Sequence, residues 1–115
     1  MNSPVYPELR LFLARLHTAM RKGQGRRLLP DLLDEIDRYA RIRFAQDLAE
    51  KALRSPTDLA QALAVQREFL EELVGLRKRV GSGPPRSGHT MEALRLLRRW
   101  GWGAEALQEP LPPAA

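Results

Sequence analysis

The sequence has no cysteine and only two histidines, and both shortages restrict the chemistry that the chain offers. Without cysteine there is no disulfide framework and no thiolate to act as a nucleophile. His17 and His89 lie far apart in the chain, and no two histidines have the spacing of one helical face. A zinc site needs several such ligands. We therefore expect no metal centre and no cofactor.

Long apolar runs are also missing, since no stretch approaches the about 20 residues of a membrane-spanning helix. The most hydrophobic N-terminal stretch, residues 9–16, contains Arg10 and Arg15, which the core of a signal peptide does not tolerate. An arginine-rich transit peptide in residues 1–30 is the alternative, because Glu8 is the one acid there. We expect a cytoplasmic protein that makes no membrane contact.

Catalytic motifs are equally scarce. The serines, which are Ser3, Ser55, Ser82 and Ser87, fall in expected caps or linkers, and none sits in a nucleophile elbow. No convincing strand precedes a glycine-rich phosphate-binding fingerprint. Four of the six acids in residues 31–50 are followed four positions later by a base, as in Asp37/Arg41 and Glu50/Arg54, which explains most of them as helix-stabilising pairs. The sequence predicts no enzyme and no small-molecule substrate.

What the chain does contain is charge, helix-forming residues and an uneven distribution of arginine. Of 115 residues, 43% are hydrophobic and 29% charged, a balance typical of a globular domain. Net charge is +5, and residues 1–30 hold six bases against one acid. Arginine outnumbers lysine sixteen to three. The base composition of the source explains this excess in one interpretation, and recognition of phosphate or carboxylate groups explains it in the other.

Hydrophobic periodicity predicts three helices in the first 80 residues, at 7–22, 30–54 and 56–80. The break between the last two contains Ser55, Pro56 and Asp58, a variant of the capping box that starts a helix. Residues 56–80 carry a heptad seam: Leu59, Leu63, Gln66, Leu70, Leu73, Arg77 and Val80. A short break between two long amphipathic helices favours an antiparallel hairpin. We expect the first helix to dock on it as a three-helix domain, 1–80.

Residues 81–89 are rich in glycine, proline and serine, so they are expected to form a linker. Residues 90–115 then form a short Arg/Trp helix and a proline-rich tail. Leu94, Leu97, Trp100 and Trp102 there resemble an amphipathic anchor for a groove on another chain. The alternative is that this segment folds back and covers the hairpin.

Two clusters of bases are candidates for nucleic-acid contact. The first is the expected loop 21–27, with Arg21, Lys22, Arg26 and Arg27, and the second is the stripe of Arg95, Arg98 and Arg99. Residues 57–70 add a motif, because Leu59-Ala60, Val65 and Leu70 resemble the helix-turn-helix of phage-repressor-type DNA-binding domains. Ala64 stands where that family has a turn glycine, and Glu68, Glu71 and Glu72 oppose phosphate contact. This resemblance predicts a bend at residues 64–66.

Residues 41–80 have a second resemblance. A helix, a Ser-Pro-Thr-Asp break and a glutamine-containing helix are similar to the small helical-hairpin proteins of tailed-phage head and packaging modules. Phasins, which coat polyester granules, have a comparable pattern of helices and breaks. Either likeness implies assembly through helix faces without catalysis.

The sequence thus predicts an all-α protein: a long antiparallel hairpin, an N-terminal docking helix and a linker-tethered C-terminal helix. The expected function is that of a scaffold, adaptor or assembly protein that meets a protein partner or itself through helix faces. Leu63 and Leu70 are its expected interface residues in the hairpin. A small basic nucleic-acid-binding protein is the alternative.

Overall fold

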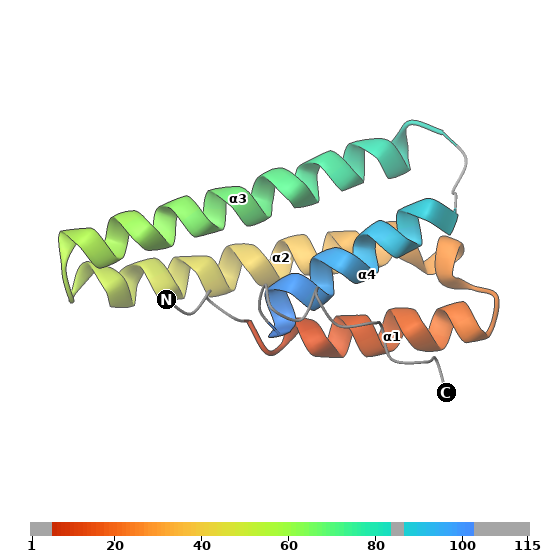
Figure 1. Cartoon of the computed structure of the whole chain (residues 1–115), viewed down its shortest axis with the longest axis horizontal. Helices are drawn as coiled ribbons and strands as arrows, with labels where there is room; N and C mark the ends of the chain where they lie inside the picture. Colours follow the sequence, from red (N-terminus) through yellow and green to blue (C-terminus); the bar gives the residue numbers. More distant parts are fainter. Residues whose placement is uncertain (1–5, 84–86, 103–115) are drawn as a thin grey trace.

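A computed structural model describes residues 6–83 and 87–102, and this part of the chain is all α, as the sequence predicts. Its helices are α1 (Leu9–Arg21), α2 (Gly25–Ala52), α3 (Pro56–Gly81) and α4 (Ser87–Trp102). Figure 1 shows that each helix runs back along the one before it. α1 packs against α2 and α4, α2 against α3, and α3 against α4, so the helices form an up-down-up-down bundle.

The turn between α1 and α2 is tighter than the expected basic loop. Gly23 adopts a positive φ of 71°, which a residue with a side chain rarely adopts, and α2 begins two residues later. Helix α2 therefore starts at Gly25 and not at residue 30, which corrects the predicted boundary. Pro30 lies inside the helix, where its missing N–H removes one intrahelical hydrogen bond.

Helix α3 begins as the sequence predicts and then continues without a break. Ser55 is the N-cap, and its hydroxyl oxygen accepts a hydrogen bond of 3.0 Å from the backbone N–H of Asp58. From Pro56 to Gly81 the helix is continuous. The bend that a helix-turn-helix requires at residues 64–66 is absent, so this expectation is wrong. An alanine at position 64 simply propagates the helix.

The core lies where all four helices meet. Its largest fully buried side chains are Leu9, Leu16, Leu29, Leu32, Leu33, Ile36, Phe69, Leu73, Leu76, Leu94 and Leu97. Four aromatic rings connect the elements in a row. The ring centroids of Tyr6 and Phe44 are 5.1 Å apart, those of Phe44 and Phe69 5.3 Å, and those of Phe69 and Trp100 5.4 Å. We call these four residues the aromatic row.

The buried face of α3 differs from the predicted seam. Its buried residues are Ala62, Gln66, Phe69, Leu73, Leu76 and Val80, which also follow a heptad spacing. Gln66, Leu73 and Val80 of the predicted seam are buried, but Leu63 is 49% exposed and Leu70 is only partly buried, so this part of the seam is turned away from the centre of the core. The cause is that α4 covers the side of α3 that carries Phe69 and Leu76.

Helix α4 belongs to the same bundle and is not a tethered appendage. It starts at Ser87 instead of residue 90, and it packs against the other three helices. The backbone N–H of Tyr6 donates a hydrogen bond of 2.8 Å to the carbonyl oxygen of Trp100, which joins the start of α1 to the end of α4. The predicted separate domain 1–80 is therefore too small, and the predicted linker 81–89 too long. Residues 84–86 and the predicted proline-rich tail within 103–115 lie outside the described residues.

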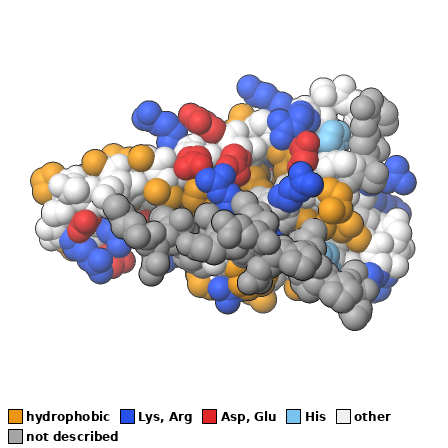
Figure 2. Space-filling model, in the orientation of Figure 1, with side chains coloured by type: hydrophobic (Ala, Val, Ile, Leu, Met, Phe, Trp, Pro, Cys, Tyr) orange, Lys and Arg blue, Asp and Glu red, His pale blue; other side chains and the backbone are white. Residues whose placement is uncertain are grey.

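One end of the hairpin projects from the bundle. Helices α2 and α3 have 28 and 26 residues, whereas α1 and α4 have 13 and 16. Figure 1 shows α1 and α4 beside one part of the hairpin, with the turn between α2 and α3 beyond them. At this turn Leu53 is 89% exposed. Figure 2 shows hydrophobic side chains on the same projecting end.

Candidate protein interface

The outer side of α3 carries a row of apolar side chains that the bundle does not cover. Leu63, Leu70 and Val74 follow one another at intervals of seven and four residues, which places them along one side of the helix. Leu63 is 49% and Val74 39% exposed, and Leu70 touches the core with only part of its surface. These three residues line one groove together with Gln66, Arg67, Glu71, Gly75 and Lys78. We call Leu63, Leu70 and Val74 the α3 stripe.

The charged residues beside the α3 stripe are not engaged elsewhere in the described part of the chain. Arg67, Glu71 and Lys78 are exposed, and none of them forms an ion pair or a hydrogen bond with another described residue. Arg67 precedes Glu71 by four positions, the less favourable order for a pair within one helix. The stripe is therefore an apolar row flanked by charges of both signs.

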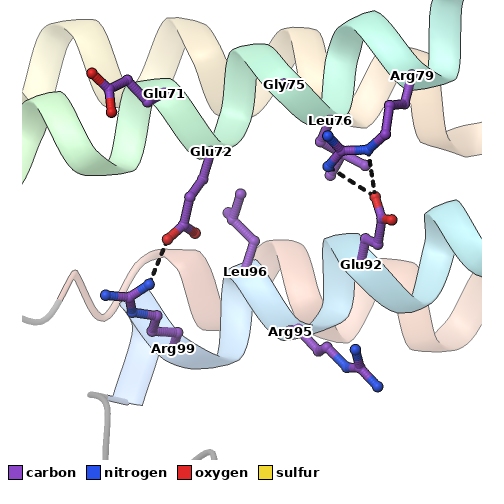
Figure 3. A pocket seen from close by; sticks show the side chains of 9 residues that line it. All are labelled: Glu71, Glu72, Gly75, Leu76, Arg79, Glu92, Arg95, Leu96 and Arg99. Atoms are coloured by element: carbon purple, nitrogen blue, oxygen red, sulfur yellow. Dashed lines mark hydrogen bonds and ion pairs between the residues drawn. The ribbon is translucent and has the colours of Figure 1, made fainter.

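The opposite side of α3 faces α4 across a polar groove, which Figure 3 shows from close by. Arg99 pairs there with Glu72 at 2.5 Å and also with Glu68. Arg79 pairs with Glu92 at 3.0 Å. Glu71 and Arg95 point away from the middle of the groove (Figure 3). Because the central charges are satisfied by one another, this groove holds two helices together and offers few free groups to a ligand.

Of the four predicted anchor residues in the C-terminal helix, three are buried in the core and one is exposed. Leu94, Leu97 and Trp100 are 2%, 0% and 4% exposed and belong to the core, which corrects the prediction that they present an anchor to a partner. Trp100 also donates from Nε1 to Glu72 at 3.2 Å. Trp102 is 42% exposed, but the Arg10 guanidinium stacks 4.9 Å from its ring centroid. Residues 87–102 fold back on the bundle, which was the alternative.

The two predicted clusters of bases differ in their exposure to solvent. Arg21, Lys22, Arg26 and Arg27 are all exposed around the turn from α1 to α2, and the first turn of α2 has no acidic residue. In α4, by contrast, Arg95 is exposed, Arg98 is buried and Arg99 is held by the acids of α3. The predicted stripe Arg95/Arg98/Arg99 is therefore not one open basic surface. Only the first cluster presents several bases to solvent.

Both tyrosines lie near α1 and have raised pKa values. Burial, reinforced by the Asp47 carboxylate, raises the pKa of Tyr6 from 10.0 to about 12. Burial also raises the pKa of Tyr39, whose hydroxyl donates a hydrogen bond of 3.0 Å to Glu8 Oε2. Neither hydroxyl is poised to lose a proton near neutral pH, so these groups have structural roles.

In residues 6–83 and 87–102, no group of three or more His, Cys, Asp or Glu side chains is placed to hold a metal ion. No helix in these ranges combines the length and the apolar character needed to cross a bilayer. Comparisons with protein-family models, curated proteins and solved structures find no match to this chain.

Sequence reasoning identified Leu63 and Leu70 but missed their neighbours on the same side of α3. Val74, Arg67 and Glu71 were overlooked because Leu63 and Leu70 were assigned to the core seam, whereas Ala62, Phe69 and Leu76 take that place beside the correctly predicted Gln66, Leu73 and Val80. The spacing of apolar residues in α3 could have indicated a second row. Gln66 and Phe69 fit a core row of their own, which leaves Leu63, Leu70 and Val74 as a second row with no partner helix.

Proposed function

We propose that this protein is a non-enzymatic helical assembly or adaptor protein that works through protein contacts along α3. The exposed α3 stripe carries the proposal. Three apolar side chains in a row on a surface helix lose water contact only when another surface covers them, and this supplies a driving force for association. Charged neighbours of both signs beside the stripe favour one orientation of a partner over others.

The rest of the bundle supports a structural role for this surface. Inter-helix ion pairs and the aromatic row fix α3 between α2 and α4, so the stripe is presented on a rigid helix. Arg77, for example, pairs with Asp34 of α2 at 2.5 Å. A rigid helix face loses little conformational entropy on binding.

Photo-crosslinking in the native host tests this function. A photoreactive amino acid replaces Leu63 in one variant and Leu11 in a control, since Leu11 is 70% exposed on α1 and outside the stripe. We expect protein adducts from position 63 and few from position 11. Equal adduct yields at both positions would contradict a function that depends on the α3 stripe.

A second candidate function is nucleic-acid binding through the turn from α1 to α2. It is favoured by the exposure of Arg21, Lys22, Arg26 and Arg27 with no acid in the first turn of α2. Light-scattering mass, measured at low and high salt with and without a short random duplex, separates the two functions. Phosphate contacts weaken steeply with salt, whereas an apolar helix interface does not. A monomer that binds the duplex only at low salt would favour this second candidate.

A further inference from the structure

The α3 stripe has a charge pattern that is complementary to itself when one helix is turned end to end. Along α3 the order is Leu63, Arg67, Leu70, Glu71 and Val74. In a second α3 that lies antiparallel, the order of these residues is reversed. Arg67 of each copy then lies near Glu71 of the other. A parallel second α3 would instead set Arg67 against Arg67 and Glu71 against Glu71, which is repulsive.

We propose that the protein forms a homodimer with two-fold symmetry, in which the α3 stripes of two copies pack antiparallel against each other. The proposal rests on the proposed function and names its partner as a second copy of this chain. In such an interface the same patch is used twice, and each contact between two different residues is repeated. The pairing is specified below by residue.

The register follows from the positions of the apolar residues. Two residues face each other when they are equally far from the two-fold axis on either side. An axis that passes between Glu68 and Phe69 places Leu63 opposite Val74 of the second copy. The same axis places Arg67 opposite Leu70 of the second copy and beside its Glu71. This register buries both ends of the stripe and brings Arg67 of each copy close to Glu71 of the other.

Space for a close approach exists beside the stripe. Ala60 and Ala64 are exposed on α3 next to Leu63, and neither side chain extends beyond a methyl group. Small residues allow two helices to approach within the 8–10 Å between axes that is usual for packed helices. From Leu59 to Lys78 the contact would span about 29 Å at 1.5 Å per residue. One helix pair of this length lies at the small end of stable interfaces, so we expect a reversible dimer.

Sedimentation velocity of the purified full-length chain over a range of concentrations is the first part of the test. We expect a monomer–dimer equilibrium that persists at high salt. Leu63→Asp should weaken it about a hundredfold, because each dimer loses two buried leucines and gains two desolvated carboxylates. Leu11→Asp is the matched control and should leave the equilibrium unchanged. Circular dichroism should show equal helicity for both variants, because both side chains are largely exposed.

Charge reversal tests the antiparallel register. Arg67→Glu and Glu71→Arg should each weaken the dimer about tenfold, since each creates two like-charge contacts. The double variant should regain the wild-type equilibrium. Mixing the two single variants should also restore dimers, because one copy then carries two acids and the other two bases. In a parallel arrangement the wild type already has two like-charge contacts, so neither single substitution would weaken the dimer; unchanged equilibria in both single variants, or failure of mixing to restore dimers, would overturn the proposed register.

Two further results would overturn the dimer. One is a wild-type chain that stays monomeric at every concentration. The other is a chain ending at Trp102 that dimerises while the full-length chain does not, because residues 103–115 would then be the occupant of the stripe. The proposed function fails separately. The proposed function still holds if the chain is monomeric and position 63 crosslinks to another protein in the host. It is contradicted if position 63 yields no more adduct than position 11.

Discussion

At the scale of single residues, the aromatic row makes ring contacts that join α2, α3 and α4. Phe69 is fully buried and meets both Phe44 and Trp100 edge-on, with interplanar angles of 85° and 80°. Aromatic pairs in this geometry contribute about 0.5–1.5 kcal/mol beyond the area that they bury. A single side chain in α3 therefore couples α2 to α4.

Truncation of this side chain should be severe. Phe69→Ala is expected to lower the free energy of unfolding by about 3–5 kcal/mol, because it leaves a cavity at the point where three helices meet. Urea denaturation followed by circular dichroism measures this loss. The control is Val74→Ala on the same helix, which should change the unfolding free energy by less than about 0.5 kcal/mol. A similar small loss for both variants would show that the row does not stabilise the bundle.

The tyrosines make a prediction about alkaline pH. Burial, with the Asp47 carboxylate, raises the pKa of Tyr6 to about 12, and burial followed by the Glu8 hydrogen bond raises the pKa of Tyr39. Above pH 10 the unfolded chain gives up protons that the folded chain keeps. Stability from these tyrosines is therefore complete below pH 10 and is lost as pH rises towards 12.

Phenolate absorbance during an alkaline titration measures this effect. We expect neither tyrosine of the folded protein to titrate at its ordinary value of about 10, and the urea midpoint to fall between pH 10 and 12. Tyr39→Phe leaves Tyr6 as the one tyrosine and assigns its transition. Ordinary titration of Tyr6 in that variant, with the fold intact, would contradict its burial.

At the scale of helices, the start of α3 was easier to predict than its buried face. Ser55 and Pro56 fix the start of α3 through local chemistry that involves no distant residue, and this prediction is confirmed. The buried face of α3 depends on which neighbours cover it. Two heptad rows fit the sequence equally well, and only the position of α4 selects the one with Phe69 and Leu76. Pairs within a helix, such as Arg41/Asp37, were predictable, whereas Arg77/Asp34 between helices was not.

The cap of α3 yields a prediction at this scale. Ser55→Ala should lower the free energy of unfolding by about 1 kcal/mol, because the N–H of Asp58 loses its acceptor. Ser55→Asp should keep most of the stability, since aspartate caps equally well. Thermal or urea denaturation distinguishes the two variants. Equal losses in both would mean that the hydroxyl contributes nothing beyond its size.

For the whole molecule, the fold class was predictable and the closure of the bundle was not. The glycine- and proline-rich composition after α3 correctly indicates a break in the helices. It carries no information about where the next helix docks, which is decided by contacts such as that between Tyr6 and Trp100. The predicted anchor residues Leu94 and Leu97 were thus misassigned, because an apolar helix face looks the same whether it meets its own chain or another.

Removal of α4 tests whether the bundle needs it. A chain ending at Gly83 should keep much of its helicity but lose fixed packing, because the core side chains of α1 and α3 that contact α4 become exposed. We expect poorly dispersed methyl signals in nuclear magnetic resonance and strong binding of a hydrophobic dye, the features of a molten globule. A truncated chain with sharp signals and a cooperative unfolding transition would show that α4 is dispensable.

The hydrogen bond from Tyr6 to the carbonyl of Trp100 also bears on the order of folding during synthesis. The hairpin of α2 and α3 uses contacts between neighbouring segments, so its formation does not require α4. Helix α1 packs on α2 early, but one side of it has no partner until α4 emerges. During that interval the nascent chain displays apolar surface that chaperones recognise. Prompt docking of α4 therefore limits how long this surface is open to aggregation.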